Sequence, residues 1–176
     1  MLRDIYAAKN FVLSYELFPP KTAKGRQALR KHVTNLLEFE PDFITCTYGA
    51  GGANRAKTLD TLALVQDITD LPVASHLTCV GATTADLRAY LQRAHEQGIQ
   101  NIVAIRGDAP KDDSTFRPVE GGLAYGNELV NLIHTEFPQF GIAVGGYPET
   151  HPEAPNPDAD LSNLKRKVDA GADVII

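Results

Sequence analysis

Five apolar, β-branched runs recur along the chain, and each is followed by a turn and a segment of helical period. The runs cover residues 11–18, 42–49, 72–79, 101–108 and 141–149, and each contains a polar or ionisable residue. Successive runs start roughly 30 residues apart, the length of one strand-plus-helix unit of a parallel barrel. In such a barrel the carboxyl ends of the strands converge on one face, where the chemistry takes place. The pattern therefore predicts a fold and the position of a site.

The spacing predicts an α/β protein, a TIM (β/α)8-type barrel that is incomplete here, with about five and a half βα units. A complete barrel needs about 250 residues, whereas this chain has 176, and residues 173–176 resemble the start of a sixth strand. We expect a single domain over residues 1–176, the N-terminal part of a longer protein. Isolated, such an opened barrel should be prone to aggregation. An open sheet of flavodoxin type is the alternative.

Composition argues against several classes of partner. The net charge is −5 with scattered basic residues, which disfavours a nucleic-acid surface. No apolar run approaches the length of a membrane span, and the N-terminus lacks the apolar stretch of a signal peptide, so we expect a cytoplasmic protein without membrane contact. Cys46 and Cys79 both lie in apolar strands, as is typical of structural thiols.

Several common catalytic motifs do not occur. The sequence has neither HxH nor HExxH, neither GxSxG nor a P-loop, and no GxGxxG. These absences disfavour a hydrolytic metal centre, a serine hydrolase and a Rossmann dinucleotide site, and we predict no metal site. No lysine lies at the strand ends, which disfavours a Schiff-base aldolase.

Two strand residues are candidates for acid–base chemistry. Glu16 lies in an otherwise apolar strand, where desolvation would raise the carboxyl pKa and keep a general acid protonated. The alternative is a strand-end glutamate paired with an arginine. His76, in the run SHLTC, could be a ligand-binding group, an acid–base group or a core histidine.

A second candidate region lies near the C-terminus. Asp160, Asn163 and Lys167 have helical spacing, so they should share one helix face. With the adjacent Arg166 they could bind the hydroxyls and phosphates of a nucleotide cofactor. The alternative is a solvent-exposed face, with Asp160 near the helix start because a negative charge there interacts favourably with the helix dipole.

Six short motifs follow one another along the chain: SYELFPPKT, TYGAGG, SHLTC, IRGD, YPETHPEA and DLSNLKRKVDAGAD. Together they resemble bacterial methylenetetrahydrofolate reductase. The resemblance implies a flavin-dependent TIM barrel that passes hydride from NADH or NADPH through FAD to a small-molecule folate, methylenetetrahydrofolate. The product, methyltetrahydrofolate, serves methionine synthesis. The resemblance also leads us to expect a homo-oligomer when the protein is full length.

The resemblance also implies roles for individual residues. Glu16 matches the general acid that protonates the bridging nitrogen of the folate, so that the ring opens to an iminium. Asp108 matches the carboxylate beside flavin and pterin that stabilises this cation and tunes the flavin potential. Positions that match FAD contacts are Thr47, Tyr48, Ala50, His76, Arg106, Gly107, Asp108, Gly126, Tyr147, His151, Ala154, Asp160, Asn163, Arg166 and Lys167.

Two other functions stay open from the sequence. The chain ends before the family's next motif, whose glutamine contacts folate and nicotinamide. One alternative is therefore a non-catalytic, flavin- or nucleotide-binding barrel fragment. Another flavin barrel, such as proline dehydrogenase, is a weaker alternative, because it should not require the glutamate of ELFPP.

Overall fold

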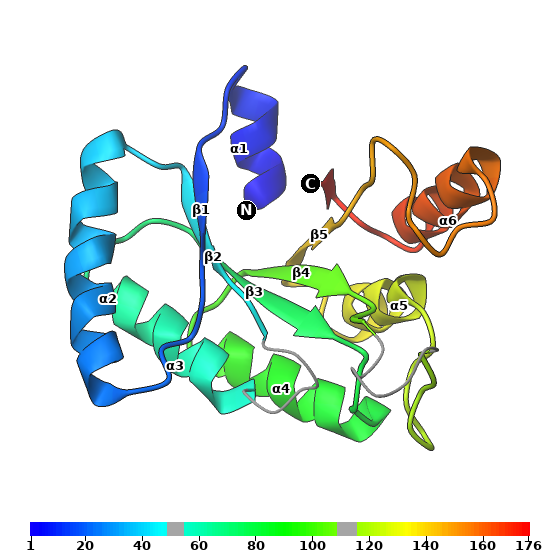
Figure 1. Cartoon of the computed structure of the whole chain (residues 1–176), viewed down its shortest axis with the longest axis horizontal. Helices are drawn as coiled ribbons and strands as arrows, with labels where there is room; N and C mark the ends of the chain where they lie inside the picture. Colours follow the sequence, from blue (N-terminus) through cyan, green and yellow to red (C-terminus); the bar gives the residue numbers. More distant parts are fainter. Residues whose placement is uncertain (49–54, 109–115) are drawn as a thin grey trace.

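A curled sheet of six parallel strands organises the protein (Figure 1), and its strands follow one another in sequence order. The computed structural model describes residues 1–48, 55–108 and 116–176. The strands are β1 (Ser14–Leu17), β2 (Phe43–Cys46), β3 (Val73–Thr78), β4 (Asn101–Ile105), β5 (Gly141–Val144) and β6 (Val174–Ile175). The helices are α1 (Leu2–Ala8), α2 (Ala23–Leu36), the 3-10 helix η1 (Leu37–Phe39), α3 (Arg55–Gln66), α4 (Thr84–Glu96), α5 (Gly126–Glu136) and α6 (Pro157–Asp169).

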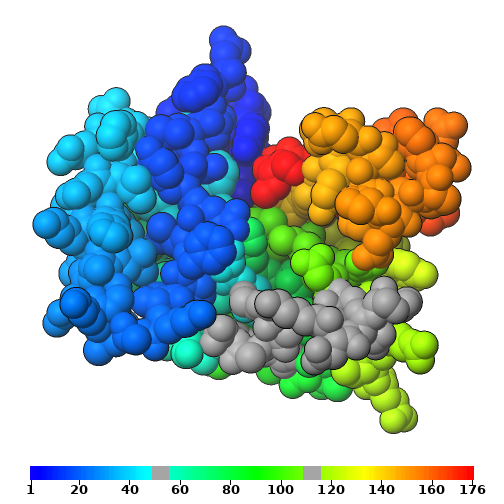
Figure 2. All heavy atoms as spheres, viewed as in Figure 1, coloured from blue at the N-terminus to red at the C-terminus, as the bar shows by residue number. Residues whose placement is uncertain are grey.

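The sheet is an open, incomplete barrel, which confirms the predicted fold class. Each strand pairs in parallel with the next, and β1 and β6 form the two edges. Helices α2 to α5 lie along the outer side of the sheet (Figure 1). In the space-filling view, a notch separates the N-terminal residues from the β5–α6 region, with the C-terminal residues in between (Figure 2).

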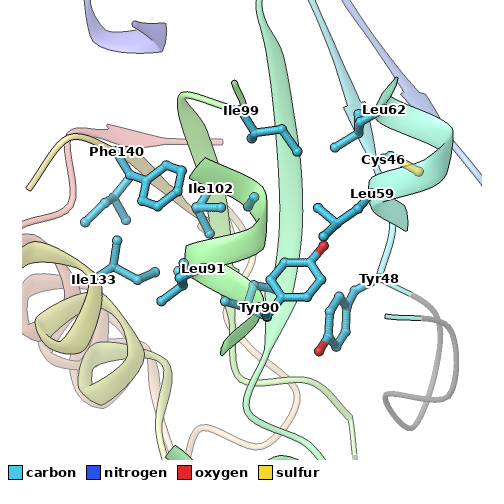
Figure 3. Packing of buried hydrophobic residues seen from close by; sticks show 14 of the residues in the cluster. Cys46, Tyr48, Leu59, Leu62, Tyr90, Leu91, Ile99, Ile102, Ile133 and Phe140 are labelled. Carbon is cyan, nitrogen blue, oxygen red and sulfur yellow. The ribbon is translucent and has the colours of Figure 1, made fainter. Parts of the chain in front are cut away.

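The larger hydrophobic core lies between the sheet and these outer helices. Alternate strand residues such as Ile44, Leu77 and Ile102 point outward and are fully buried, as the period of two in a strand requires. The apolar faces of α4 and α5 pack against them (Figure 3). Each such side chain contributes about 1.5–3 kcal/mol when fully buried, so this layer is the main source of stability.

A smaller core fills the inner face of the sheet at the end where the strands begin. It combines inward-facing strand residues with the N-terminal helix α1, which the sequence analysis did not anticipate (Figure 1). Leu2 is 1% exposed, and its N–H donates to the buried Asn101 side chain at 2.9 Å. Arg3 pairs with Asp173 at 3.1 Å. The inner face is thus filled at its amino end, and a ligand would have to approach from the carboxyl end.

The strand boundaries expected from the apolar runs were wrong. The strands are shorter than the apolar runs, because the backbone leaves the sheet early; after β4, for example, Gly107 adopts φ +87°, which is incompatible with an extended ladder. On α6 the apolar residues Leu161 and Val168 are exposed. Among the described residues α6 packs mainly against α5 (Figure 1), so only Leu164 of that face reaches the core.

Candidate functional site

The inner face of the sheet carries Glu16 on β1 and His76 on β3, toward the carboxyl ends of the strands. Glu16 is exposed rather than desolvated among apolar neighbours, so the predicted burial of its carboxyl group was wrong. Strand alternation places Glu16 on the opposite side of β1 from Leu17, which packs into the outer core. The side chain therefore faces the region left uncovered above the inner core.

His76 is 8% exposed, and its Nε2 atom has no hydrogen-bond partner among the described residues. Burial lowers the pKa of His76 below its usual value, while the Glu16 carboxylate acts in the opposite direction. The imidazole is therefore predominantly neutral at neutral pH. The nearby Thr78 hydroxyl is also buried and unpaired within the described part of the chain. Because buried polar atoms are nearly always satisfied, these two atoms are candidates for hydrogen bonds to a ligand.

The end of β2 is fixed by a hydrogen bond from the following helix. Thr58 on α3 donates its hydroxyl to the Thr47 carbonyl at 2.8 Å. Tyr48 is 2% exposed, and its ring meets the Tyr90 ring edge-on at 5.2 Å between centroids (Figure 3). Thr47 and Tyr48 therefore have defined positions, whereas Ala50 lies outside the described residues.

The end of β4 brings several predicted residues together. Arg106 forms a two-point ion pair with Glu153, with Nη1–Oε2 at 2.7 Å and Nη2–Oε1 at 2.8 Å. The paired carboxylate raises the pKa of Arg106 further, so the side chain is a permanent cation. Gly126, the first residue of α5, lies beside the Arg106 backbone. Asp108, two residues after Arg106 in the chain, is exposed.

The segment of residues 147–154, here called the 147–154 loop, lies between β5 and α6. The rings of Tyr147 and His151 meet edge-on at 4.6 Å. The His151 N–H donates to Asp160 Oδ2 at 3.1 Å, which ties the loop to the first turns of α6. Ala154 closes a turn back to the His151 carbonyl at 2.9 Å.

Helix α6 contains the predicted cofactor face. Lys167 donates to the Gly145 carbonyl at 2.9 Å, and burial lowers its pKa, opposed by the Asp160 carboxylate. Arg166 donates to Asn163 at 3.0 Å on the exposed side. The helix therefore directs Asp160 and Lys167 inward, toward the ends of β5 and its loop, and leaves Arg166 and Asn163 in solvent.

Three residues of this region were not predicted from the sequence: Thr58, Tyr90 and Glu153. Thr58 and Tyr90 lie in helices, where they read as ordinary helix residues. Glu153 lies in a proline-rich loop that has no periodic pattern. Each is found only through a contact distant in sequence, with Thr47, Ser75 and Arg106 respectively.

Other reactive groups within the described ranges do not form a second site. Burial raises the pKa of Cys46 and of Cys79 to about 12, so neither thiol is a nucleophile near neutral pH. Residues 1–48, 55–108 and 116–176 hold no cluster of three His, Cys, Asp or Glu side chains suited to a metal ion. The same residues include no helix with the length and apolarity needed to cross a bilayer.

Comparison with known proteins identifies the family. The family model described as methylenetetrahydrofolate reductase matches residues 1–176. The chain belongs to the methylenetetrahydrofolate reductase family. It is 42% identical over 160 residues to 5,10-methylenetetrahydrofolate reductase of Escherichia coli, with 91% of this chain and 52% of that protein covered. It is 41% identical over 168 residues to methylenetetrahydrofolate reductase 2 of Saccharomyces cerevisiae, with 93% of this chain and 28% of that protein covered.

The Arabidopsis thaliana protein named methylenetetrahydrofolate reductase (NADH) 1 is 39% identical over 173 residues, with 93% of this chain and 29% of that protein covered. The chain thus spans about half the length of the Escherichia coli relative and less than a third of the yeast and plant relatives. The recognition made from the six motifs is confirmed.

Solved structures support the barrel architecture alone. A phosphoenolpyruvate phosphomutase from Streptomyces platensis matches with a TM-score of 0.65 at 14% identity, covering 99% of this chain and 61% of that one. A 2,3-dimethylmalate lyase matches with a TM-score of 0.66 at 10% identity, covering 99% and 60%. At such low identity the likeness concerns the fold and not the chemistry.

Proposed function

We propose that the protein acts as an FAD-dependent reductase that converts 5,10-methylenetetrahydrofolate to 5-methyltetrahydrofolate, with NADH or NADPH as reductant, in one-carbon and methionine metabolism. The observation that carries the proposal is the family match across residues 1–176. The name of the Arabidopsis relative includes NADH, so NADH is the reductant to test first. We further propose a cytoplasmic homo-oligomer that binds a folate and neither nucleic acid nor membrane.

The residues at the carboxyl ends of the strands fit a flavin nucleotide. His76 Nε2 and Thr78 Oγ1 are buried polar atoms without a partner among the described residues. Arg106 offers a permanent cation with N–H groups beyond those paired with Glu153. Asp160, Asn163, Arg166 and Lys167 on α6 could serve ribose hydroxyls and phosphates. When bound, FAD would supply hydride transfer between nicotinamide and folate.

Glu16 is proposed as the general acid. Its exposed position on the inner face leaves it accessible to a substrate arriving from the carboxyl end. From there it would donate a proton to the bridging nitrogen of the folate, so that the ring opens. A substrate that covers the site would exclude water from the reacting groups.

Asp108 is proposed to stabilise the cation formed when the folate ring opens. It follows the turn at Gly107 and is exposed at the same end of the sheet. A fixed carboxylate near a developing positive charge lowers the energy of the transition state. The proposed roles of Glu16 and Asp108 are therefore distinct: one transfers a proton and the other stabilises a cation.

The test is a pair of measurements on the purified protein. Flavin absorbance after incubation with FAD and removal of excess reports binding, and oxidation of NADH coupled to methyltetrahydrofolate formation reports turnover. Binding and turnover together support the reductase. Bound flavin without turnover would favour a non-catalytic flavin-binding protein, and the absence of both would contradict the proposal.

A further inference from the structure

Glu153 touches two of the proposed flavin-contacting residues, although it was not among the predicted site residues. Its carboxylate forms the two-point ion pair with Arg106, 47 positions earlier in the chain. Its backbone N–H donates to His151 Nδ1 at 3.1 Å. One residue thus contacts both the end of β4 and the histidine of the 147–154 loop.

We propose that Glu153 is a positioning residue of the flavin site, which orients Arg106 and His151 for the cofactor. This inference rests on the proposed function, since it assumes that these residues face a flavin. Glu153 itself need not touch the ligand. Its side chain is 55% exposed, whereas that of Arg106 is 23% exposed.

The geometry at Arg106 leaves little freedom to its side chain. Nε donates to the Gly107 carbonyl at 3.1 Å, and the guanidinium carbon lies 5.1 Å from the centre of the Phe116 ring. The Glu153 carboxylate occupies one N–H of each terminal nitrogen. A guanidinium has five N–H groups, so two remain, in fixed directions, for an anionic or carbonyl acceptor.

The contact with His151 selects the tautomer of that imidazole. Because Nδ1 accepts a hydrogen bond from the Glu153 backbone, a neutral His151 carries its proton on Nε2. That atom is then a donor toward a ligand. The edge-on Tyr147 ring and the bond from the His151 N–H to Asp160 restrict the rest of the residue.

The backbone of the loop supplies an independent observation. Thr150 has φ +112°, a conformation that is unfavourable for a β-branched residue. Such a conformation persists only where surrounding contacts impose it, and it concentrates at binding sites. The contacts of His151 with Asp160 and of Glu153 with Arg106 hold the residues that follow Thr150.

The experiment compares flavin affinity across matched variants of the full protein, measured by quenching of FAD fluorescence. Glu153→Gln and Glu153→Ala should weaken FAD binding roughly ten- to hundredfold, the scale of a lost charge-assisted hydrogen bond. Glu153→Asp, which retains the charge, should recover part of the affinity. Glu149→Gln, the same charge change at an exposed position of the same loop, should bind FAD like the parent.

Further measurements separate positioning from general support of the fold. The urea midpoint of the flavin-free protein should change little in Glu153→Gln, because an exposed ion pair stabilises weakly. The double variant Arg106→Gln with Glu153→Gln should bind FAD no more weakly than Arg106→Gln alone. Unchanged or tighter binding by Glu153→Gln would overturn the proposal, and tighter binding would show that the carboxylate competes with the cofactor for Arg106. A parent that binds no FAD would instead contradict the proposed function itself.

Discussion

Ser75 and Tyr90 share a buried hydrogen bond of 2.6 Å between their hydroxyl groups, which joins β3 to α4. Ser75 points into the outer core, and the next residue, His76, points to the inner face. The bond therefore anchors the strand directly behind the His76 imidazole. Tyr90 also packs edge-on against Tyr48 at the end of β2 (Figure 3), so one side chain supports two neighbouring strand ends.

Tyr90→Phe should lower the free energy of unfolding by about 1–3 kcal/mol, because it removes one partner of a buried hydrogen bond and leaves the Ser75 hydroxyl less satisfied. Urea denaturation measures the change. Tyr15→Phe, which removes a hydroxyl from a half-buried ring on β1, is the control. A loss in Tyr90→Phe no larger than in the control would mean that the bond does not stabilise the fold.

Gly107→Ala should destabilise the end of β4. The residue has φ +87°, and an added Cβ would lie 3.0 Å from Val80 Cγ1. The left-handed conformation alone costs a non-glycine residue about 1–2 kcal/mol, and the contact adds to it. Thermal unfolding compares this variant with Gly145→Ala, where an added Cβ meets nothing within 4 Å. Equal melting temperatures for the two variants would contradict the expected strain.

The periodic part of the fold could be predicted from the sequence because its signals are local. Alternation and helical spacing identified the parallel units. The local cap of α4 is Thr83, whose side chain accepts from the Asp86 N–H. Helix α1 was not predicted, because seven residues with two inward apolar positions, Leu2 and Ile5, give too short a periodic signal.

The site was predictable only in part. The positions of the predicted strand ends identified residues that lie at one edge of the sheet. The exposure of Glu16, however, depends on which face of β1 the outer core covers, and this is a tertiary property. The pair of Arg106 and Glu153 joins loops far apart in the chain, and no spacing rule connects them. The sequence thus predicts which edge of the sheet holds the site, but not the contacts that fix the side chains there.

The free energy of unfolding should decrease as the pH is lowered, because of His76. Its pKa in the folded protein lies below the usual value of 6.5, so between these two values the unfolded chain binds more protons. The favourable contribution of neutral His76 to the free energy of unfolding is fully present above about pH 6.5. It is lost as the pH falls through the folded-state pKa of this histidine. Urea midpoints between pH 5 and pH 8, a range chosen about the histidine value, should show a smaller slope in His76→Gln than in the parent. His32→Gln, on the exposed face of α2, should keep the parental slope.

Asp108→Asn should retain FAD and raise the flavin midpoint potential, on the order of tens of millivolts given the exposure of the side chain to screening solvent. Removing a negative charge near the isoalloxazine favours the anionic reduced form. The folate half-reaction should slow as well. Spectroelectrochemistry on parent and variant measures the shift, with Asp70→Asn, at the opposite end of the sheet, as control. An unchanged potential would mean that Asp108 lies away from the flavin.

Glu16→Gln should abolish folate reduction and leave reduction of the flavin by nicotinamide intact. Glutamine is nearly isosteric but cannot donate the proton that opens the folate ring, and loss of a general acid costs about 10²–10⁴-fold in rate. Since Glu16 is exposed and its neighbour His76 already has a lowered pKa, the substitution should not disturb the fold. Stopped-flow absorbance resolves the two half-reactions, with Glu38→Gln on η1 as control. If both half-reactions slowed equally, Glu16 would be a structural residue and the proton would have to come from another group.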